Sequence, residues 1–294
     1  MRRFPLLIVI LLLAGCDSGS GSNEIPQYYQ AQLLLDGLKG LGGGARYEAW
    51  ALIAAEWQSV AVFNFDQNDR LVDLNGRLVA NTFITEVDME PATEVLVTIE
   101  DRRDADLEPS DTQVLRGEVN GSLTTLSFVE AVGDFSGAAA SYTIGTPTDL
   151  DTGNEAFGVW LGTPGTYTPT MTAPNPGEGW QFELWIELTS GTWSLGKFDD
   201  PAGRDIGHPF SDMLELFQVP GEDLLVNPPA GETFPLAVAG HTIFVTLEPN
   251  PDDFGVTPYG IRLLEADIAP SAAPGSGFPM TNVGSYPSGT VQFR

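Results

Sequence analysis

The stretch QFELWIELTSGTWSLGKF, residues 181–198, carries the pattern that decides the fold. Apolar side chains at 182, 184, 186 and 188 alternate with other residues, and a short turn separates this run from the next one. Alternation with a period of two between turns is typical of half-buried antiparallel strands. EVLVTIE (94–100) and HTIFVTLE (241–248) alternate in the same way, and 33 Gly and 22 Pro interrupt the chain at short intervals. The sequence therefore predicts an all-β fold.

The pattern of this stretch occurs twice. RYEAWALIAAEWQSVAVFNF (46–65) places Glu-x-Trp, then Ser, then Phe, 135 positions before the same residues of the stretch. VTIE at 97–100 and VTLE at 245–248 continue the match in the same order. A shared order of matches indicates an internal duplication. The second copy has gained residues between 198 and 243, in a Pro- and Gly-rich stretch that we expect to be a long loop.

We therefore expect two related antiparallel β-sandwich-like units from this duplication. The first unit spans 28–150, the second spans 151–268, and an irregular C-terminal tail follows over 269–294. YYQAQLLLDGL (28–38) also alternates and is predicted as a strand, with a short helix as the alternative. SLTTLSFVEA, GAAASYTIG and EAFGVWLG are predicted as three further strands between the matched segments.

The N-terminus has the features of an export signal. Two arginines precede an apolar run from Phe4 to Leu13, which is shorter than the roughly 20 residues of a spanning helix. LAGC closes the run, and its Cys16 is the only cysteine of the chain. This ending resembles the lipobox of bacterial lipoproteins, in which the cysteine is lipidated; an ordinary secretory signal is the alternative. We expect residues 1–16 to be a lipoprotein signal with lipidated Cys16, and 17–27 to be a Gly/Ser-rich tether.

Charge restricts the partners. The chain has 40 acidic and 13 basic residues, a net charge of −27, which repels nucleic acid and anionic lipid headgroups. We expect an extracytoplasmic protein of the cell envelope, attached to either membrane through Cys16, with no nucleic-acid partner. A solvated acidic surface accounts for this charge, and a cationic partner or calcium is the alternative.

The repeated residues resemble a known family. Tyr/Phe-Glu-x-Trp, a short turn, Phe, then Val-Thr-x-Glu-Pro and a later Pro are similar to the extracytoplasmic C-terminal domain of anti-sigma-K factors. The matching positions are Tyr47, Glu48, Trp50, Phe63, Thr98, Glu100 and Pro109 in the first copy, and Phe182, Glu183, Trp185, Phe198, Thr246, Glu248, Pro249 and Pro258 in the second. The first copy departs at Val62, where the family has Gly, and at Asp101, where it has Pro. The resemblance implies the outer domain alone, without the sigma-binding part.

Catalytic signatures are missing from the sequence. His208 and His241 are isolated, and no other cysteine is present to complete a zinc site or a nucleophile–base pair. Two repeated carboxyls could serve as the acid and base of a glycosidase. Duplication places equivalent carboxyls in separate units, which favours a structural role. We therefore expect a non-enzymatic binding or sensing module, with an unknown envelope protein or glycan as its partner and no cofactor.

Two binding chemistries stay open as alternatives. DLDTGNE places Asp149, Asp151 and Glu155 around a glycine, and FDQNDRLVDLNG (65–76) clusters further Asp and Asn residues, as hard-oxygen calcium ligands would be. Neither stretch completes an EF-hand loop, so ordinary Asx turns are favoured. The six tryptophans could stack on sugar rings of a polysaccharide, but their alternation inside strands favours packing in the core.

Overall fold

The computed structural model describes residues 27–104, 106–211, 218–251 and 257–294. In these ranges the chain forms strands and one four-residue helix, α1 (Phe128–Ala131), which Ser127 caps through a hydrogen bond from the Val129 amide. The strand pairs are antiparallel throughout the described ranges. The prediction of an all-β, antiparallel fold is confirmed. No helix among these residues is long and apolar enough to cross a membrane.

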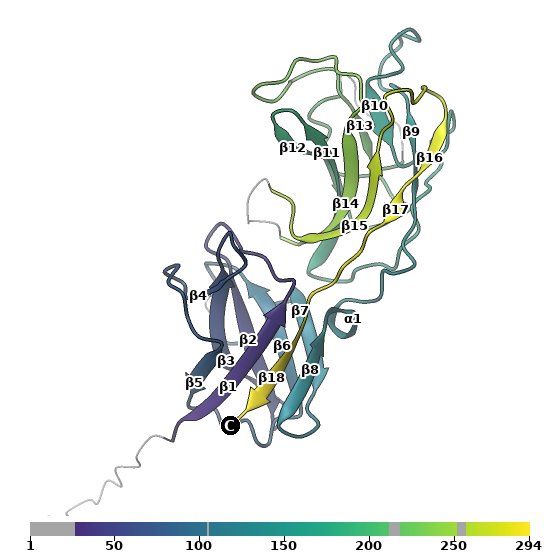
Figure 1. The fold of residues 1–294 in the computed structure, drawn as a ribbon. Coiled ribbons are helices and arrows are strands. Elements are labelled where there is room, and N and C mark those ends of the chain that lie inside the picture. The colour runs from purple at the N-terminus through teal and green to yellow at the C-terminus, as the bar shows by residue number, and fades with distance from the viewer. Residues whose placement is uncertain (1–26, 105, 212–217, 252–256) are drawn as a thin grey trace, which may run out of the picture.

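The first half of the chain and the C-terminal strand build one nine-stranded sheet in the order β4-β3-β2-β6-β7-β8-β18-β1-β5. The strands are β1 (Tyr29–Asp36), β2 (Arg46–Ile53), β3 (Glu56–Phe65), β4 (Leu71–Val72), β5 (Thr82–Thr85), β6 (Glu94–Glu100), β7 (Gln113–Glu118), β8 (Leu123–Ser127) and β18 (Ser288–Phe293). The sheet curls around its own core (Figure 1), and Phe63 of β3 meets Phe83 of β5 with ring centroids 5.8 Å apart. A single curled sheet therefore encloses this core. The sequence predicted a sandwich-like unit, in which two sheets would enclose it.

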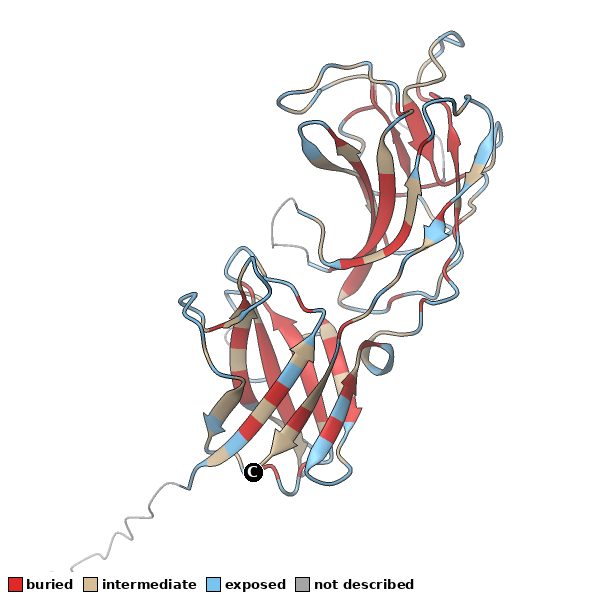
Figure 2. Ribbon diagram, in the orientation of Figure 1, coloured by how far each residue is buried: buried red, intermediate tan, exposed pale blue. Residues whose placement is uncertain are grey.

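The second half of the chain builds two smaller sheets, called here the two-sheet part. One has the order β12-β11-β14-β15-β17 and the other β13-β10-β9-β16. The strands are β9 (Ser141–Ile144), β10 (Gly158–Trp160), β11 (Trp180–Leu188), β12 (Gly191–Phe198), β13 (Gly221–Asp223), β14 (Thr242–Pro249), β15 (Ile261–Asp267), β16 (Gly277–Pro279) and β17 (Thr281–Asn282). β11 and β14 are almost entirely buried (Figure 2), because they lie inside their sheet and are covered on both faces.

The C-terminal residues are integral to both parts, which corrects the prediction of an irregular tail over 269–294. β18 pairs with β1 on one side and with β8 on the other, and it buries Val291 in the core of the nine-stranded sheet. β16 and β17 complete the edges of the two smaller sheets. The chain therefore leaves the nine-stranded sheet after β8 and returns to it at its end.

Other predicted boundaries also differ from the structure. β1 is a strand, so the helix alternative for residues 28–38 is wrong. SLTTLSFVEA divides into β8 and α1, because a Ser127 cap starts a helical turn there. β9 precedes the expected boundary at residue 150, yet it pairs with β10 and β16 of the two-sheet part. The stretch expected to be one long loop contains β13.

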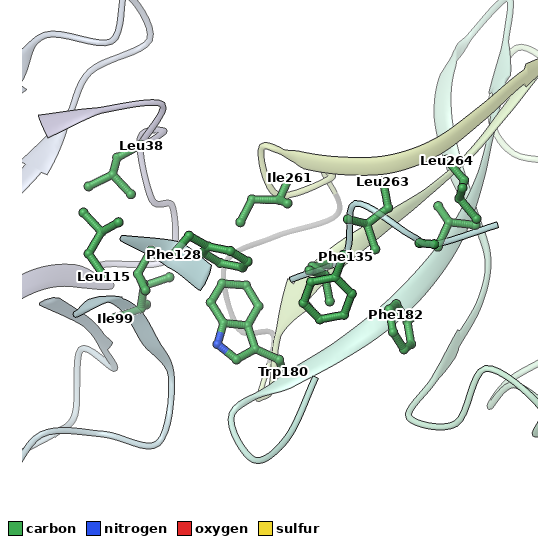
Figure 3. Close-up of a cluster of buried hydrophobic side chains, with 14 of the residues drawn as sticks. Leu38, Ile99, Leu115, Phe128, Phe135, Trp180, Phe182, Ile261, Leu263 and Leu264 are labelled. Atoms are coloured by element: carbon green, nitrogen blue, oxygen red, sulfur yellow. The ribbon is translucent and has the colours of Figure 1, made fainter. Parts of the chain in front are cut away.

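The two parts share a continuous apolar joint. The Trp180 ring packs edge-on against Phe128 at a centroid distance of 5.7 Å, and Phe135 and Phe182 continue the contact into the two-sheet part (Figure 3). The Trp180 indole N–H also donates to the Gln113 carbonyl at 2.9 Å, so the buried ring has no unsatisfied donor. One hydrophobic core therefore extends through both parts.

Candidate functional site

The two copies of the repeated motif occupy the same kind of position in different sheets. Trp50 of β2 lies opposite Ser59 of β3, and Trp185 of β11 lies opposite Ser194 of β12. A register shift directly precedes each tryptophan, between Ala49 and Trp50 and between Leu184 and Trp185. The neighbouring strand pairs also shift at matching points, between Val97 and Thr98 and between Val245 and Thr246.

The aromatic pairs of the motif also correspond. Tyr47 stacks on Phe63 with ring centroids 5.7 Å apart, and Phe182 stacks on Phe198 at 5.4 Å. In each copy the two rings come from cross-strand partners on paired strands. Cross-strand aromatic pairs of this kind stabilise a sheet beyond the area that they bury.

A chain of hydrogen bonds runs from each tryptophan to a buried glutamate. The Trp50 indole N–H donates to the Thr98 hydroxyl at 2.9 Å, and Thr98 donates to Glu100. In the two-sheet part, Trp185 donates to Thr246 at 2.8 Å, and Thr246 donates to Glu248.

Each of these glutamates also holds the loop that follows its strand. Glu100 accepts the Ser110 amide at 3.1 Å, and Glu248 accepts the Tyr259 amide at 2.9 and 3.0 Å from its two oxygens. The preceding residues are the repeated prolines, Pro109 and Pro258. Pro249 ends β14 opposite Trp180. Both carboxyls are 1% exposed and bound to their own loops.

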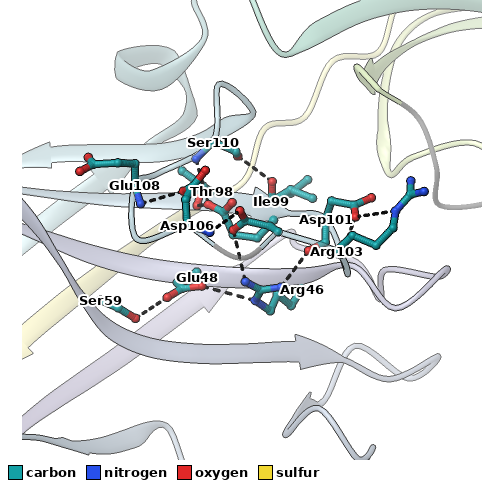
Figure 4. Close-up of polar contacts among 12 residues, drawn as sticks. Arg46, Glu48, Ser59, Thr98, Ile99, Asp101, Arg103, Asp106, Glu108 and Ser110 are labelled. Atoms are coloured by element: carbon teal, nitrogen blue, oxygen red, sulfur yellow. Dashed lines mark hydrogen bonds and ion pairs between the residues drawn. The ribbon is translucent and has the colours of Figure 1, made fainter.

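Each copy has a second buried carboxyl with a basic residue beside it, and the strand that supplies the basic residue differs between the two copies. Glu48 accepts the Ser59 hydroxyl and lies 3.4 Å from the Arg46 guanidinium (Figure 4). Glu183 instead faces the Lys197 ammonium at 3.7 Å. Lys197 lies opposite Glu183, at the position that Val62 occupies opposite Glu48.

The exchange of cations keeps each carboxyl compensated. Gln181 stands at the position of Arg46, so each copy has one basic residue near its buried glutamate. An uncompensated charge in these places would be strongly destabilising.

Burial raises the pKa of Glu100, against the hydrogen bonds from Thr98 and Ser110 that lower it.

A cluster of buried carboxyls that the sequence did not predict lies in the two-sheet part. Asp205, Glu222 and Asp223 are each 0% exposed. Asp223 accepts the Trp160 indole N–H at 2.9 Å and both the amide and the hydroxyl of Thr148, at 2.9 and 2.6 Å. Burial raises the pKa of Asp223 to about 6 and that of Glu222 to about 8. Perturbed carboxyls of this kind are candidates for a functional site.

Glycines make room for this cluster. A Cβ at Gly196 would overlap the Asp205 carboxyl, and a Cβ at Gly158 would overlap the Asp223 carboxyl. The Gly221 amide donates to Asp205 at 2.9 Å. The one signal in the sequence is a pair of acidic residues inside the apolar run VPGEDLLV, which the nearby Pro and Gly residues made look like part of a loop.

His208 joins the cluster, although the sequence suggested an isolated loop position. Its Nε2 lies 3.6 Å from Asp205 Oδ1, and its Nδ1 lies 3.8 Å from Glu222 Oε2. His241 lies apart from the cluster, with Nδ1 3.1 Å from the Glu187 carbonyl. The two histidines therefore have unlike surroundings.

The calcium candidates form turns. Asp149 accepts the Asp151 amide and Asp151 accepts the Gly153 amide, both at 2.9 Å, while Glu155 accepts the Thr146 amide at 3.0 Å. Asp66 and Asp73 bind backbone amides two and four residues ahead in the same way. The bonds that the aspartates accept are Asx-type bonds, whereas Glu155 binds an amide nine residues earlier in the chain. Within the described ranges, no group of three or more His, Cys, Asp or Glu side chains is arranged to hold a metal ion.

The tryptophans do not form an open row for sugar rings. Trp50, Trp160, Trp180 and Trp185 are at most 3% exposed. Trp57 and Trp193 are half-buried, and Trp193 donates to Ser190 at 3.0 Å. A glycan surface built on Trp180 and Trp193 therefore lacks one of its two rings.

Cys16, the predicted lipidation site, lies outside the described residues. No family model, no curated protein and no solved structure matches the chain. The likeness to anti-sigma-K factors therefore stays a prediction that rests on the motif residues themselves.

Proposed function

We propose that the chain is a non-enzymatic binding or sensing module of the cell envelope, held by a lipid on Cys16. In this proposal a β unit similar to the outer domain of anti-sigma-K factors has been duplicated. Matching register shifts, stacked rings and hydrogen-bond chains in the two copies support the duplication.

One observation carries the non-enzymatic part of the proposal. The chain Trp50–Thr98–Glu100 ends on the Ser110 amide, and its counterpart from Trp185 ends on the Tyr259 amide. The carboxyls of Glu100 and Glu248 are thus hydrogen-bonded within the protein and buried away from solvent. A motif used in this way stabilises loops, which leaves recognition to the surface.

The position of the chain start supports display from a membrane. The Gln30 amide bonds to the Arg294 carbonyl at 2.9 Å, so the first described residues and the C-terminal residues lie together at one end of the nine-stranded sheet (Figure 1). A tether attached there would direct the two-sheet part away from the membrane. The loops of that part would then meet a partner first.

Lipidation is tested by Cys16→Ser. We expect the wild type to sediment with membranes and to resist high salt, and the variant to move to the soluble fraction. A variant that still sediments in high salt would contradict the lipid anchor.

Binding is tested with the soluble Cys16→Ser protein as bait in crosslinked envelope extracts. We expect a partner retained by the folded bait and lost when the bait is heat-unfolded. The same protein should not hydrolyse glycan, peptide or ester substrates. Robust turnover that Glu100→Gln or Glu248→Gln abolishes would overturn the non-enzymatic assignment.

A further inference from the structure

A cavity lies in the mouth of the curled nine-stranded sheet, at the end where β1 begins and β18 ends (Figure 1). Its volume is about 590 Å³, which is in the range of small-molecule sites in proteins. The loop of residues 86–93 joins β5, at one edge of the sheet, to β6 near its middle, and it buries Met89 to 2% exposure. The mouths of closed or curled sheets are places where ligand sites recur.

Two strands place aromatic rings on the wall of this cavity. Phe293 of β18 pairs with Ala31 of β1, and Tyr29 lies two positions before Ala31 on the same strand. Cross-strand partners and residues two positions apart share one face of a sheet, and Ala31 is 0% exposed in the core. Tyr29 and Phe293 therefore both lie on the inner face. Met89 and Val119 extend the apolar part of the lining.

The rim of the cavity carries two carboxyls. Asp88 and Glu90 are exposed members of its lining, and Asp88 accepts the Glu90 amide at 3.0 Å. The Tyr29 hydroxyl donates to Asp88, and burial together with the Asp88 and Glu90 carboxyls raises the pKa of Tyr29, so both carboxyls lie near this hydroxyl. Within the described ranges, neither carboxyl forms an ion pair with a basic side chain.

One basic residue, Arg294, also lines the cavity. Its guanidinium donates to the Gln292 side chain at 3.1 Å, and its backbone pairs with Gln30. The lining thus holds two carboxylates against one guanidinium and has a net negative charge. This charge attracts a cationic ligand and repels an anionic one.

We propose that this cavity binds an organic ammonium ion that carries an apolar body, such as an alkylammonium. The apolar body packs against Met89 and Val119, and the cation lies at the rim beside Asp88 and Glu90. Carboxylates attract the charge, and an aromatic ring such as that of Tyr29 attracts an ammonium group even where the group has no N–H to donate. The site requires neither lipidation nor duplication, and it lies at the opposite end of the molecule from the loops of the two-sheet part (Figure 1).

Three probes with the same alkyl chain separate charge from apolar contact: octyltrimethylammonium, octanol and octanoate. Methyl NMR of the Cys16→Ser protein reports binding through Met89, while Met171 and Met280, buried in the two-sheet part, are the reference signals. We expect octyltrimethylammonium to shift the Met89 signal saturably and to leave the reference signals in place. Octanol should bind more weakly, and octanoate should bind most weakly.

Variants of the rim test the carboxyls. Asp88→Asn and Glu90→Gln should each lower the affinity for octyltrimethylammonium about two- to fivefold, as expected for exposed ion pairs, and the double variant should lower it further. Asp36→Asn is the matched control, because it removes the same charge from an exposed position at the other end of β1. Its affinity should equal that of the starting protein.

The comparison of the three probes leaves the site residues unchanged, so it decides the proposal even if a rim variant does not fold. Equal affinities for octanol and octyltrimethylammonium, or a Met89 signal that no probe moves, would overturn the ammonium site. An equal loss of affinity in Asp36→Asn and Asp88→Asn would also overturn it, because the charge of the whole protein would then attract the cation without the rim.

Discussion

At the residue scale, the indole N–H of Trp50 and that of Trp185 make the same kind of hydrogen bond, each to a threonine hydroxyl. Trp50 and Trp185 each orient a threonine hydroxyl, and that hydroxyl fixes a buried glutamate. A third tryptophan, Trp160, binds the Asp223 carboxyl directly, without a threonine between them. Buried carboxyls in this protein are thus stabilised largely by neutral donors and less by salt bridges.

Truncation of either repeated tryptophan should destabilise the fold. Trp50→Ala and Trp185→Ala remove a nearly buried ring and the donor to a threonine, and each should lower the free energy of unfolding by about 3–5 kcal/mol. Trp193→Ala is the control, because that ring is half-buried. Denaturant titration measures all three. An equal loss in Trp193→Ala would contradict the role assigned to the buried pair.

Glu100 should make stability depend on pH. Because burial raises its pKa above 4.5, its contribution is full below that value and declines as the pH rises through the raised pKa. Glu100→Gln cannot lose a proton and can still accept the Ser110 amide. The variant should therefore show a flatter stability curve above about pH 4.5.

Exposed Glu118 of β7 supplies the control for this titration. Glu118→Gln should leave the pH dependence of the free energy of unfolding as in the wild type. Chemical denaturation at several pH values gives the curves. A Glu100→Gln curve parallel to that of the wild type would exclude Glu100 as the titrating group.

The sequence predicted part of these sites. Glu48, Trp50, Thr98 and Glu100 could be found because their copies recur at fixed spacing. The cluster of Asp205, Glu222 and Asp223 has no second copy, and its members meet only through pairing with β10 and contact with the 205–211 segment. Contacts between segments without local periodicity leave no pattern to detect.

At the element scale, β18 shows why the C-terminal strands were missed. Its neighbours in the sheet are β1 and β8, both far away in the sequence. Gly, Pro and Ser dominate the residues before it, and within the strand only Val291 is buried. Composition therefore indicated an irregular tail, while backbone pairing on both edges made it a strand. The strong alternation of β11 and β14 had no such ambiguity.

Gly289 should be sensitive because β18 lies close to β1. A Cβ at Gly289 would lie 2.7 Å from Leu35 Cδ2 and 2.8 Å from the Leu34 carbonyl oxygen. Gly289→Ala should lower the free energy of unfolding by about 1–3 kcal/mol through overpacking. A Cβ at Gly137 would meet nothing within 4 Å, so Gly137→Ala is the control. Equal melting temperatures of the two variants would show that β18 can shift to admit the methyl group.

At the scale of the whole molecule, the loops that the repeated glutamates hold also build the joint. Glu248 holds Tyr259, whose hydroxyl lies 2.9 Å from that of Tyr47. After the Glu100-bound loop, Thr112 donates to the Gly179 carbonyl at 3.2 Å. The polar motif of each copy therefore supports the contact between the two parts as well as its own sheet.

Gly179 is the point of closest approach at this joint. A Cβ there would overlap the Asp111 carbonyl group and lie 2.6 Å from the Thr112 amide nitrogen. Gly177 has nearly the same backbone angle, with φ +81° against +78°, and a Cβ there would meet nothing within 4 Å. Alanine at either glycine strains a left-handed backbone by about 1–2 kcal/mol. The difference in the free energy of unfolding between the two variants therefore measures the effect of the close contact at the joint.

Gly179→Ala should therefore loosen the two parts, whereas Gly177→Ala should not. We expect one cooperative unfolding transition in the wild type and in Gly177→Ala, because a single core extends through the joint. Gly179→Ala should unfold in two steps and show a larger radius of gyration in solution scattering. Since Trp180 is 3% exposed at the joint, its separation should also expose an additional tryptophan to a quencher. One transition and an unchanged radius in Gly179→Ala would mean that the apolar rings around Trp180 hold the parts together without the close backbone contact.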